Sequence, residues 1–268
     1  MSDASMGQEE KAELLKHNST TFFDTSFAYL KQHLGHRPGK MHLYIGPSGA
    51  GKSTLMRSLL IDLMESTPHP RKVLVWLSEE SINDFKMELA RSKYDDQLKL
   101  AHVTVVSELE LPETVFDTEM YFNELCREHE VVIYDNITTS QMCMSKNFQQ
   151  QSEFFHRIKK TASAANAALI IFAHTKKDAI QKNKILSIED IRGNSTIVNL
   201  AEFCYVMQQF NVNDEVVSTI RILKHRGFSN VVEKIFKFYF IAKVNLYTLS
   251  AAIRFKGFKD TYKNQDKI

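Results

Sequence analysis

The sequence predicts an α/β protein with a mostly parallel central sheet, flanked by helices and extended by C-terminal antiparallel strands. Two observations support this prediction. From Met41 to His174, short apolar runs alternate with amphipathic stretches, which is the pattern of parallel strands joined by helices. After Asn199, strand-like runs follow one another with little helix between them, which is typical of antiparallel strands.

Each predicted strand is a short apolar run, and each predicted helix repeats its apolar residues at helical spacing. The predicted parallel strands are 41–45, 73–77, 102–106, 131–135 and 168–174, and the predicted antiparallel strands are 202–210, 216–224 and 233–241. The predicted helices between the parallel strands are 52–66, 81–92, 115–128 and 148–165. Before the first strand, helices are predicted over 8–17 and over 22–34, the second ending at Gly35.

The chain of 268 residues is long enough for one large domain with small appendages. We expect a polar, helical N-terminal extension at 1–20, a main domain at 21–250 and a basic tail at 251–268. An apolar share of 43% excludes a disordered chain, and the absence of a long uninterrupted apolar run excludes a membrane span. Three cysteines without CxxC spacing support neither a disulfide framework nor a zinc site, and the polar N-terminus is not a secretory signal. These features predict a cytoplasmic protein.

The near-neutral net charge of +2 conceals an uneven distribution of charge. From Arg221 to Ile268 the chain has eleven Lys and Arg against three Asp and Glu, so the preceding part is acidic overall. This basic end has two interpretations: a surface that faces phosphate or an acidic neighbour, or a solvated face with a frayed tail.

Glycine is scarce in this chain, yet three of its nine glycines, Gly46, Gly49 and Gly51, fall within six consecutive positions. The segment matches G-x-x-x-x-G-K-[ST] after an apolar strand and before a helix, the context that identifies a phosphate-binding P-loop. Glycines let backbone N–H groups surround phosphate oxygens, and the following helix adds its positive N-terminal end. The sequence therefore predicts ATP as the ligand, with nine predicted binding residues: Gly46, Pro47, Ser48, Gly49, Ala50, Gly51, Lys52, Ser53 and Thr54.

A Mg²⁺ ion is expected to accompany ATP. Within the P-loop, Lys52 is placed for the β- and γ-phosphates and the Ser53 hydroxyl for Mg²⁺. Asp135 ends the apolar run 131–135, where a carboxylate can reach the metal through water. The next residue is Asn136, which cannot act as a base, so hydrolysis needs a carboxylate from elsewhere in the chain.

Glu79 is the predicted catalytic carboxylate. It follows the strand at 73–77, and the carboxyl ends of strands in an open α/β sheet form the ligand side. Glu80 can exchange roles with Glu79 in this prediction. Either glutamate is alternatively part of the N-cap region of the helix that follows, where the helix dipole favours a negative charge.

His174 ends the strand at 168–174, where a polar residue can contact the γ-phosphate and report its loss to the next loop. The alternative is an exposed loop histidine. The basic segment that follows is interpreted either as a loop that contacts nucleic acid or as a solvated loop. Its candidate nucleic-acid-binding residues are Lys176, Lys177, Lys182, Lys184 and Arg192.

The order of these motifs resembles the RecA-like P-loop ATPase core, particularly that of DnaB-type hexameric replicative helicases and small RepA-like plasmid helicases. Glu79 in LSEES, Asp135 without an adjacent Glu, and His174 at the next strand end are similar to that family's pattern. So is the stretch 188–208, in which an Arg-Gly-Asn segment precedes a strand with an Ala-Glu pair. The resemblance extends from about Thr21 to Phe240, nearly the whole chain.

The family also has a strand that ends in Lys-x-Arg followed by Gly, and RILKHRGF at 221–228 offers Lys224 and Arg226 in this pattern. In that family the two cations reach into the ATP site of the neighbouring subunit. The resemblance therefore implies that Lys224 and Arg226 act in trans, with the arginine stabilising charge on the transferred phosphoryl group. Without the resemblance, they are a pair of surface cations.

The resemblance implies an ATP-hydrolysing helicase of DNA replication that translocates on single-stranded DNA. It implies a homo-oligomer, either a hexamer or a filament, with ATP at the subunit interfaces, and replication proteins as partners. A recombinase-like filament on DNA is a close alternative. A nucleotide-switched ATPase without motor activity, such as a loader, a partition factor or a KaiC-like signalling protein, is the alternative from another class.

Overall fold

The computed structural model describes residues 35–66, 71–92, 97–111, 117–175, 195–212, 215–226, 235–241 and 246–248, with seven isolated positions: 25, 27, 30, 186, 187, 190 and 232. The predicted extension at 1–20 and the predicted tail at 251–268 lie outside these residues. Within the described part of the chain, no helix is long and apolar enough to cross a membrane.

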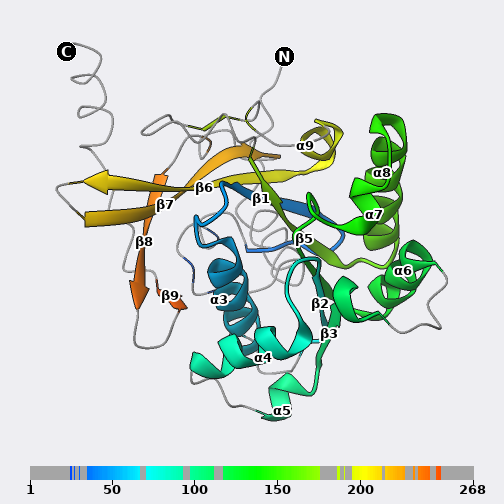
Figure 1. Cartoon of the computed structure of the whole chain (residues 1–268), viewed down its shortest axis with the longest axis horizontal. Helices are drawn as coiled ribbons and strands as arrows, with labels where there is room; N and C mark the ends of the chain where they lie inside the picture. Colours follow the sequence, from blue (N-terminus) through cyan, green and yellow to red (C-terminus); the bar gives the residue numbers. More distant parts are fainter. Residues whose placement is uncertain are drawn as a thin grey trace, which may run out of the picture.

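One nine-stranded sheet forms the centre of the molecule (Figure 1). In spatial order its strands are β3 (Val103–Ser107), β2 (Val73–Leu77), β4 (Val131–Asp135), β5 (Ala168–His174), β1 (Met41–Gly46), β6 (Phe203–Val212), β7 (Glu215–His225), β8 (Ile235–Ile241) and β9 (Leu246–Thr248). The strands from β3 to β6 are parallel to their neighbours, and β7, β8 and β9 continue the sheet with antiparallel pairing. The predicted fold class is therefore confirmed.

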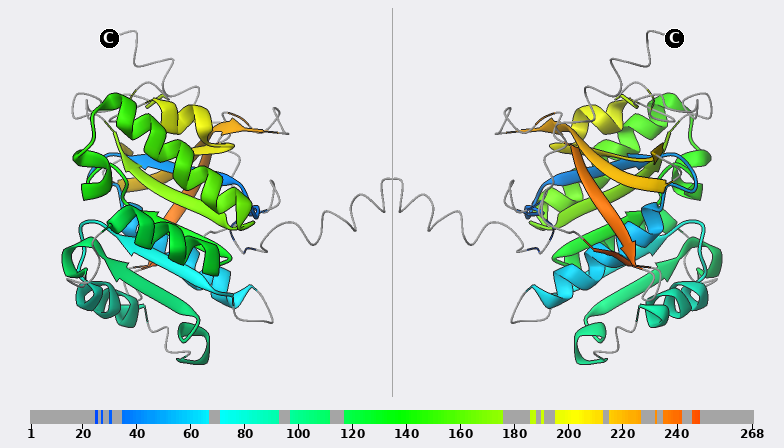
Figure 2. Two further views of the ribbon diagram at one scale, coloured as in Figure 1. Left: turned by 90° about the vertical axis from the view of Figure 1, so that its right-hand side faces the viewer. Right: turned by 90° about the vertical axis from the view of Figure 1, so that its left-hand side faces the viewer.

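Helices cover both faces of the sheet, as the two side views in Figure 2 show. One face packs against α3 (Lys52–Glu65), α4 (Ile82–Arg91) and the short α5 (Gln97–Leu100). The other face packs against α6 (Thr118–Glu128), α7 (Gln141–Met144), α8 (Phe148–Ala164) and α9 (Thr196–Leu200). A short 3₁₀ turn, η1 (Glu108–Glu110), follows β3.

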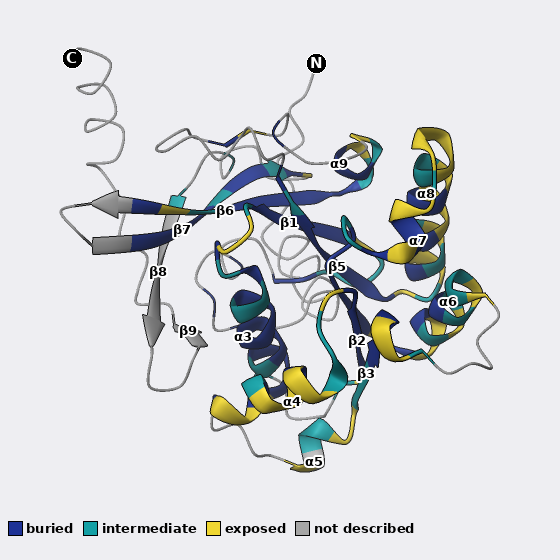
Figure 3. Ribbon diagram, viewed as in Figure 1, coloured by how far each residue is buried: buried dark blue, intermediate teal, exposed yellow. Residues whose placement is uncertain are grey.

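The central strands are buried on both faces because helices lie on both sides of them (Figure 3). In β1, Tyr44 packs into the core under α3 and α4, whereas Leu43 and Ile45 pack into the core under α6, α7 and α8. This explains why the sequence shows continuous apolar runs here rather than alternation of apolar and polar residues.

Polar residues at the helix starts account for several of the observed boundaries. Ser81 is the N-cap of α4 and accepts a hydrogen bond from the Asp84 N–H. Asn147 forms a capping box with Gln150 at the start of α8. Since Ser81 is the N-cap of α4, neither Glu79 nor Glu80 occupies that position.

One strand differs from its predicted direction. The run at 202–210 was expected to be antiparallel, but β6 pairs in parallel with β1 through His42 and Phe203 and is antiparallel only to β7. The short helix α9 ends at Leu200 and returns the chain to the amino end of β1, so β6 enters the sheet in the same direction as β1. Five short elements were not predicted: α5, α7, α9, η1 and β9.

Candidate functional site

The candidate site lies at the carboxyl edge of the parallel strands. Gly46 at the end of β1 is in register with His174 at the end of β5. Asp135 at the end of β4 is in register with Leu77 at the end of β2. Because β2, β4, β5 and β1 are consecutive in the sheet, the P-loop, His174, Asp135 and the segment after Leu77 meet at this edge.

The P-loop has the backbone conformation that its glycines permit. Gly49 and Gly51 have φ of 78° and 84°, a left-handed conformation that disfavours other residues. A Cβ atom at Gly46 would lie 2.9 Å from the carbonyl oxygen of Met207 on β6, so the start of the loop also requires glycine. Gly51 caps α3 without a side-chain hydrogen bond. The first N–H groups of this fourteen-residue helix are therefore directed at the loop, which suits a phosphate group.

Lys52 is buried at the base of the loop. Its Nζ donates to the carbonyl oxygens of Gly46 and Pro47 at 3.1 and 2.9 Å, and it lies 2.9 Å from Nδ1 of His174. Burial lowers the pKa of Lys52 to about 8, although the negative charges of Asp135 and Glu79 act to raise that pKa. A buried cation enclosed by neutral carbonyl groups is well suited to a polyanionic ligand.

Asp135 and Ser53 provide the oxygen atoms that a Mg²⁺ ion would need. Asp135 is buried at the end of β4, and the Ser53 hydroxyl at the start of α3 is close enough to stabilise its charged form. Burial raises the pKa of Asp135, while Ser53 and Lys52 favour its charged form. A carboxylate and a hydroxyl close together beside a phosphate loop fit a hard cation that also retains water and phosphate ligands.

The structure separates the two glutamates that the sequence left interchangeable. Glu79 is half-exposed, and its Oε1 lies 3.4 Å from Nε2 of His174. The carboxylate of Glu80 instead accepts two hydrogen bonds of 3.1 Å from the nearly buried guanidinium of Arg57 on α3. Glu79 therefore faces the P-loop lysine and the strand-end histidine, whereas Glu80 is part of an ion pair behind the loop.

The electrostatic environment of Glu79 affects what its carboxylate can do. His174, when it directs a proton at the carboxylate, lowers the pKa of Glu79 to about 2 against the opposing effect of burial, and Thr139 and Asn136 lower it further. A carboxylate with so low a pKa is a weak proton acceptor at neutral pH. Glu79 is therefore better suited to hold and orient an attacking water molecule than to remove its proton fully.

Asn136, which was considered only as a residue that cannot be a base, is at the centre of a hydrogen-bond network. It is buried, and its Nδ2 lies 2.7 Å from Nε2 of His174. Its Oδ1 accepts hydrogen bonds from the backbone N–H groups of Thr138 and Thr139 at 3.0 and 3.2 Å. The Thr138 hydroxyl also accepts a hydrogen bond of 3.1 Å from the backbone of His174. His174 is thus a mostly buried residue within a polar network rather than an exposed loop histidine.

Glu108, a buried carboxylate just after β3, was not predicted as a site residue from the sequence. It accepts hydrogen bonds of 2.7 to 2.8 Å from Trp76 Nε1, the Tyr134 hydroxyl, the Ser140 hydroxyl and the backbone N–H of Gln141. These bonds fix the end of the turn that begins at Asn136. A sequence signal existed, since acidic Glu108 follows a strand at the same edge as Glu79, but its partners come from three separate segments.

Lys224 and Arg226 lie at the opposite edge of the sheet. Since β7 is antiparallel to β6, His225 pairs with Phe203, which in turn pairs with His42 near the start of β1. Lys224 donates to the carbonyl oxygens of Val198 and Asn199 at 2.8 and 3.1 Å.

Arg226 is more exposed than Lys224. The backbone N–H of Arg226 donates to Glu202, and its guanidinium lies 3.9 Å from the carboxylate of the same residue. Neither cation is near the P-loop of its own chain. The five candidate nucleic-acid-binding residues, Lys176, Lys177, Lys182, Lys184 and Arg192, lie outside the described residues.

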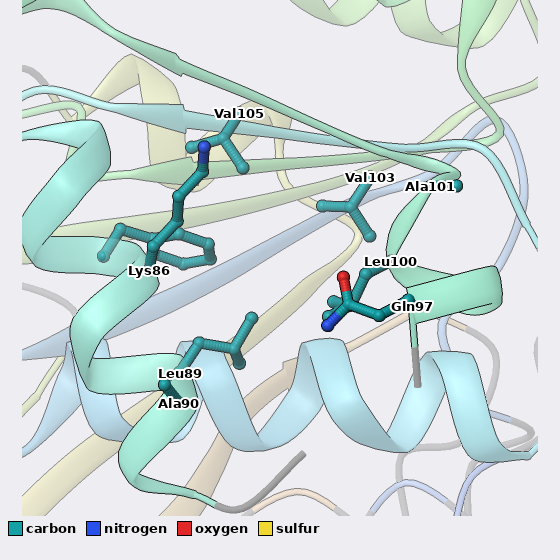
Figure 4. A pocket seen from close by; sticks show the side chains of 9 residues that line it. Lys86, Leu89, Ala90, Gln97, Leu100, Ala101, Val103 and Val105 are labelled. Atoms are coloured by element: carbon teal, nitrogen blue, oxygen red, sulfur yellow. The ribbon is translucent and has the colours of Figure 1, made fainter. Parts of the chain in front are cut away.

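A groove is present away from the P-loop, beside the edge strand β3 (Figure 4). It lies between β3 and the helices α4 and α5. Its lining residues are Phe85, Lys86, Leu89, Ala90, Gln97, Leu100, Ala101, Val103 and Val105. The lining is mostly apolar and has no carboxylate or histidine, so it lacks the combination of groups assembled at the P-loop.

Two comparisons with known proteins bear on this site. A family model described as an AAA domain matches residues 9–179, a segment that includes the P-loop, Glu79, Asp135 and His174. A search of curated proteins finds no match to the chain.

Proposed function

The chain belongs to the AAA domain family of P-loop ATPases, whose model covers more than half of its length, and we propose that it is an ATP-hydrolysing motor of the helicase type. In this proposal the protein assembles into a ring or filament with ATP at its subunit interfaces. Hydrolysis moves the assembly along single-stranded DNA.

Each group at the carboxyl edge has a role in the proposed reaction. The P-loop backbone and Lys52 hold the phosphates, while Ser53 and Asp135 hold Mg²⁺, which neutralises phosphate charge when it is bound. Glu79 orients the attacking water, and His174 contacts the γ-phosphate. The contacts of Lys52 with His174 and of His174 with Glu79 support this proposal, because they gather three such groups at one place.

The observation that carries the oligomeric part of the proposal is the position of Lys224 and Arg226. They are at the level of His42, which precedes Gly46 by four residues along β1. Four residues of strand span about 13 Å, so the two cations lie at the amino edge of the sheet, away from the P-loop at the carboxyl edge. A cation in this position cannot assist hydrolysis at the P-loop of its own chain. It can assist only at the P-loop of a neighbouring subunit, which supports a site shared between two subunits.

A mixing experiment tests the shared site. We expect Arg226→Ala to lower kcat by roughly 10³–10⁵-fold, because the arginine stabilises charge on the transferred phosphoryl group. Lys52→Ala subunits lack a working P-loop but retain Arg226. Mixed with Arg226→Ala subunits, they complete interfaces that have both groups, so turnover should recover. Arg91→Ala, at an exposed site on α4, is the control and should not change the rate.

Two outcomes would contradict the shared site. The first is an unchanged rate in Arg226→Ala. The second is that turnover does not recover when the two variants are mixed, although light scattering shows that the mixed assemblies have the normal mass. The second would mean that Arg226 acts through the stability of its own subunit.

The motor activity is tested by measuring the ATPase rate with and without single-stranded DNA over a range of salt concentrations. A motor on DNA should be stimulated by DNA, and its affinity should fall steeply as salt rises, because Lys and Arg displace counterions from phosphates. Replacing Lys176, Lys177, Lys182 and Lys184 by alanine together should reduce that salt dependence. If ATP is hydrolysed but DNA neither binds nor stimulates, the helicase proposal fails and a nucleotide-switched ATPase is favoured.

A further inference from the structure

The imidazole ring of His174 lies between two hydrogen-bond donors. Asn136 Nδ2 is 2.7 Å from its Nε2, and Lys52 Nζ is 2.9 Å from its Nδ1. A neutral imidazole has one N–H and one lone pair, so it can accept a hydrogen bond at only one nitrogen. The two neighbours therefore compete to decide which nitrogen of His174 carries the proton.

The orientation of the Asn136 amide is fixed. Its oxygen accepts from the backbone N–H groups of Thr138 and Thr139, which can only donate. The amide nitrogen must then face His174. Asn136 is buried, and rotating its amide would place an NH₂ group against two backbone donors.

Lys52 is more adaptable than Asn136. Its ammonium group has the carbonyl oxygens of Gly46 and Pro47 to receive its protons, and its side chain has four rotatable bonds. An unfavourable contact at Nδ1 can be relieved by a small movement of Lys52, whereas one at Nε2 cannot be relieved by Asn136. The fixed donor therefore determines the position of the ring proton.

Glu79 is the remaining neighbour of Nε2, and its carboxylate would favour a proton there. Its oxygen is 3.4 Å from Nε2, beyond the usual range for a strong hydrogen bond, whereas the Asn136 nitrogen is at 2.7 Å. Two donors at 2.7 Å repel each other more strongly than a lone pair and a carboxylate at 3.4 Å. The shorter contact therefore prevails.

We propose that Asn136 is a positioning residue that holds His174 as the Nδ1–H tautomer, so that the histidine presents a hydrogen-bond donor toward Lys52 and the P-loop. The effect of this tautomer on hydrolysis rests on the proposed ATPase function, whereas the tautomer itself does not. An Nδ1–H group and the Lys52 ammonium then converge as two donors, an arrangement that suits a phosphate oxygen and disfavours a neutral acceptor.

The tautomer is tested directly by long-range ¹H–¹⁵N NMR of the protein labelled with ¹⁵N-histidine, without nucleotide. The measurement is made at about pH 7.5, below the pKa of about 8 at which Lys52 loses its charge. The His174 signals are assigned by their loss in His174→Asn. We expect a protonated Nδ1 and an unprotonated Nε2. A proton on Nε2, alone or together with one on Nδ1, would overturn the proposal.

Asn136→Asp tests whether Asn136 is the cause. A carboxylate can still accept from Thr138 and Thr139, but its second oxygen can only accept from Nε2–H, so the ring proton should move to Nε2. Asn147→Asp, at the N-cap of α8, is the matched control and should leave the His174 signals unchanged. An unchanged tautomer in Asn136→Asp would show that Asn136 does not control the ring.

Two substitutions of His174 test the consequence for hydrolysis. The amide nitrogen of asparagine and Nδ1 of histidine are the same number of bonds from the backbone. The amide nitrogen of glutamine likewise matches Nε2 of histidine. We expect both variants to lower the rate, His174→Gln by roughly 10–100-fold more than His174→Asn, the value of a hydrogen bond to a charged group. The reverse order would overturn the predicted orientation. If the unmodified protein hydrolyses no ATP, the proposed function fails, while the NMR experiment still decides the role of Asn136.

Discussion

The two edges of the sheet hold polar groups in contrasting ways. At the carboxyl edge, Lys52, Asp135 and Asn136 are buried, and His174 contacts Lys52, Asn136 and Glu79 from three other segments of the chain. At the amino edge, His42 stacks on Phe203 with ring centroids 4.3 Å apart and contacts His36 edge to face at 4.8 Å.

The contrast extends to charge. Burial lowers the pKa of His36 to about 3 and that of His42 well below its ordinary value, so both rings are neutral at physiological pH. Lys224 and Arg226 lie outside the ring stack, whereas Arg37 lies over the Phe203 ring, 5.4 Å from its centroid. The carboxyl edge thus gathers polar and charged groups where a ligand can bind, whereas neutral rings pack the amino edge as part of the core. Substitutions at the first should mainly affect activity, and those within the second stability.

The largest expected effect of a single carboxyl-edge substitution is that of Lys52→Ala. Turnover should fall to background and nucleotide affinity should decrease, because the buried cation that faces the phosphates is removed. Steady-state ATPase assays and titration with a fluorescent nucleotide measure the two effects. Lys40→Ala, at an exposed lysine just before β1, is the control. Near-normal turnover in Lys52→Ala would remove the basis for treating this edge as an ATP site.

The next effect separates Glu79 from Glu80. Glu79→Gln should lower kcat by roughly 10²–10⁴-fold with little change in KM, because the group that orients the water loses its charge. Glu80→Gln weakens the ion pair with the buried Arg57 and should instead lower the free energy of unfolding by about 1–3 kcal/mol. If Glu80→Gln loses activity and Glu79→Gln does not, the roles that we assign are reversed.

Glu108 tests whether a residue of the carboxyl edge can be primarily structural. In the unmodified protein, the carboxylate oxygens of Glu108 face hydrogen-bond donors. Glu108→Gln places an NH₂ group against some of these donors, so we expect a loss of about 1–3 kcal/mol in the free energy of unfolding. Urea denaturation measures it, with exposed Glu124→Gln on α6 as the control. A stability equal to that of the unmodified protein would mean that the turn after β4 is held by other contacts.

The remaining effect concerns the amino edge and is seen only when the pH is changed. The pKa of His36 is lowered in the folded state, so between its ordinary value and about pH 3 the unfolded chain binds the extra proton. Stability conferred by a neutral His36 is therefore complete above that interval and declines as pH falls through it. His36→Gln should reduce the slope of unfolding free energy against pH by about 1.4 kcal/mol per pH unit in this interval.

Urea denaturation at a series of pH values measures this slope. Exposed His102→Gln should leave it unchanged. An equal slope in His36→Gln and the unmodified protein would show that His36 does not titrate differently on unfolding, and the contrast between the edges would weaken.

Much of the fold could be predicted because burial leaves a clear pattern in the sequence. The predicted strands at 73–77, 131–135 and 168–174 coincide with β2, β4 and β5, since strands covered on both faces are continuous apolar runs. The short helices α7 and α9 could not be predicted, because four or five residues contain too little periodicity to identify a helix. The direction of β6 depended on the path of the chain through α9, which no local pattern encodes.

The sequence by itself determined the P-loop, the strand-end carboxylate Asp135 and the alternation of strands and helices that brings them to one edge. These follow from local rules: glycine for unusual backbone, and strand ends for ligand contacts. Only the tertiary structure distinguished Glu79 from Glu80 and made Asn136 the partner of His174. It also placed Lys224 and Arg226 at the far edge. Each of these outcomes depends on which segments become neighbours, and distant residues meet through packing that spacing along the chain does not specify.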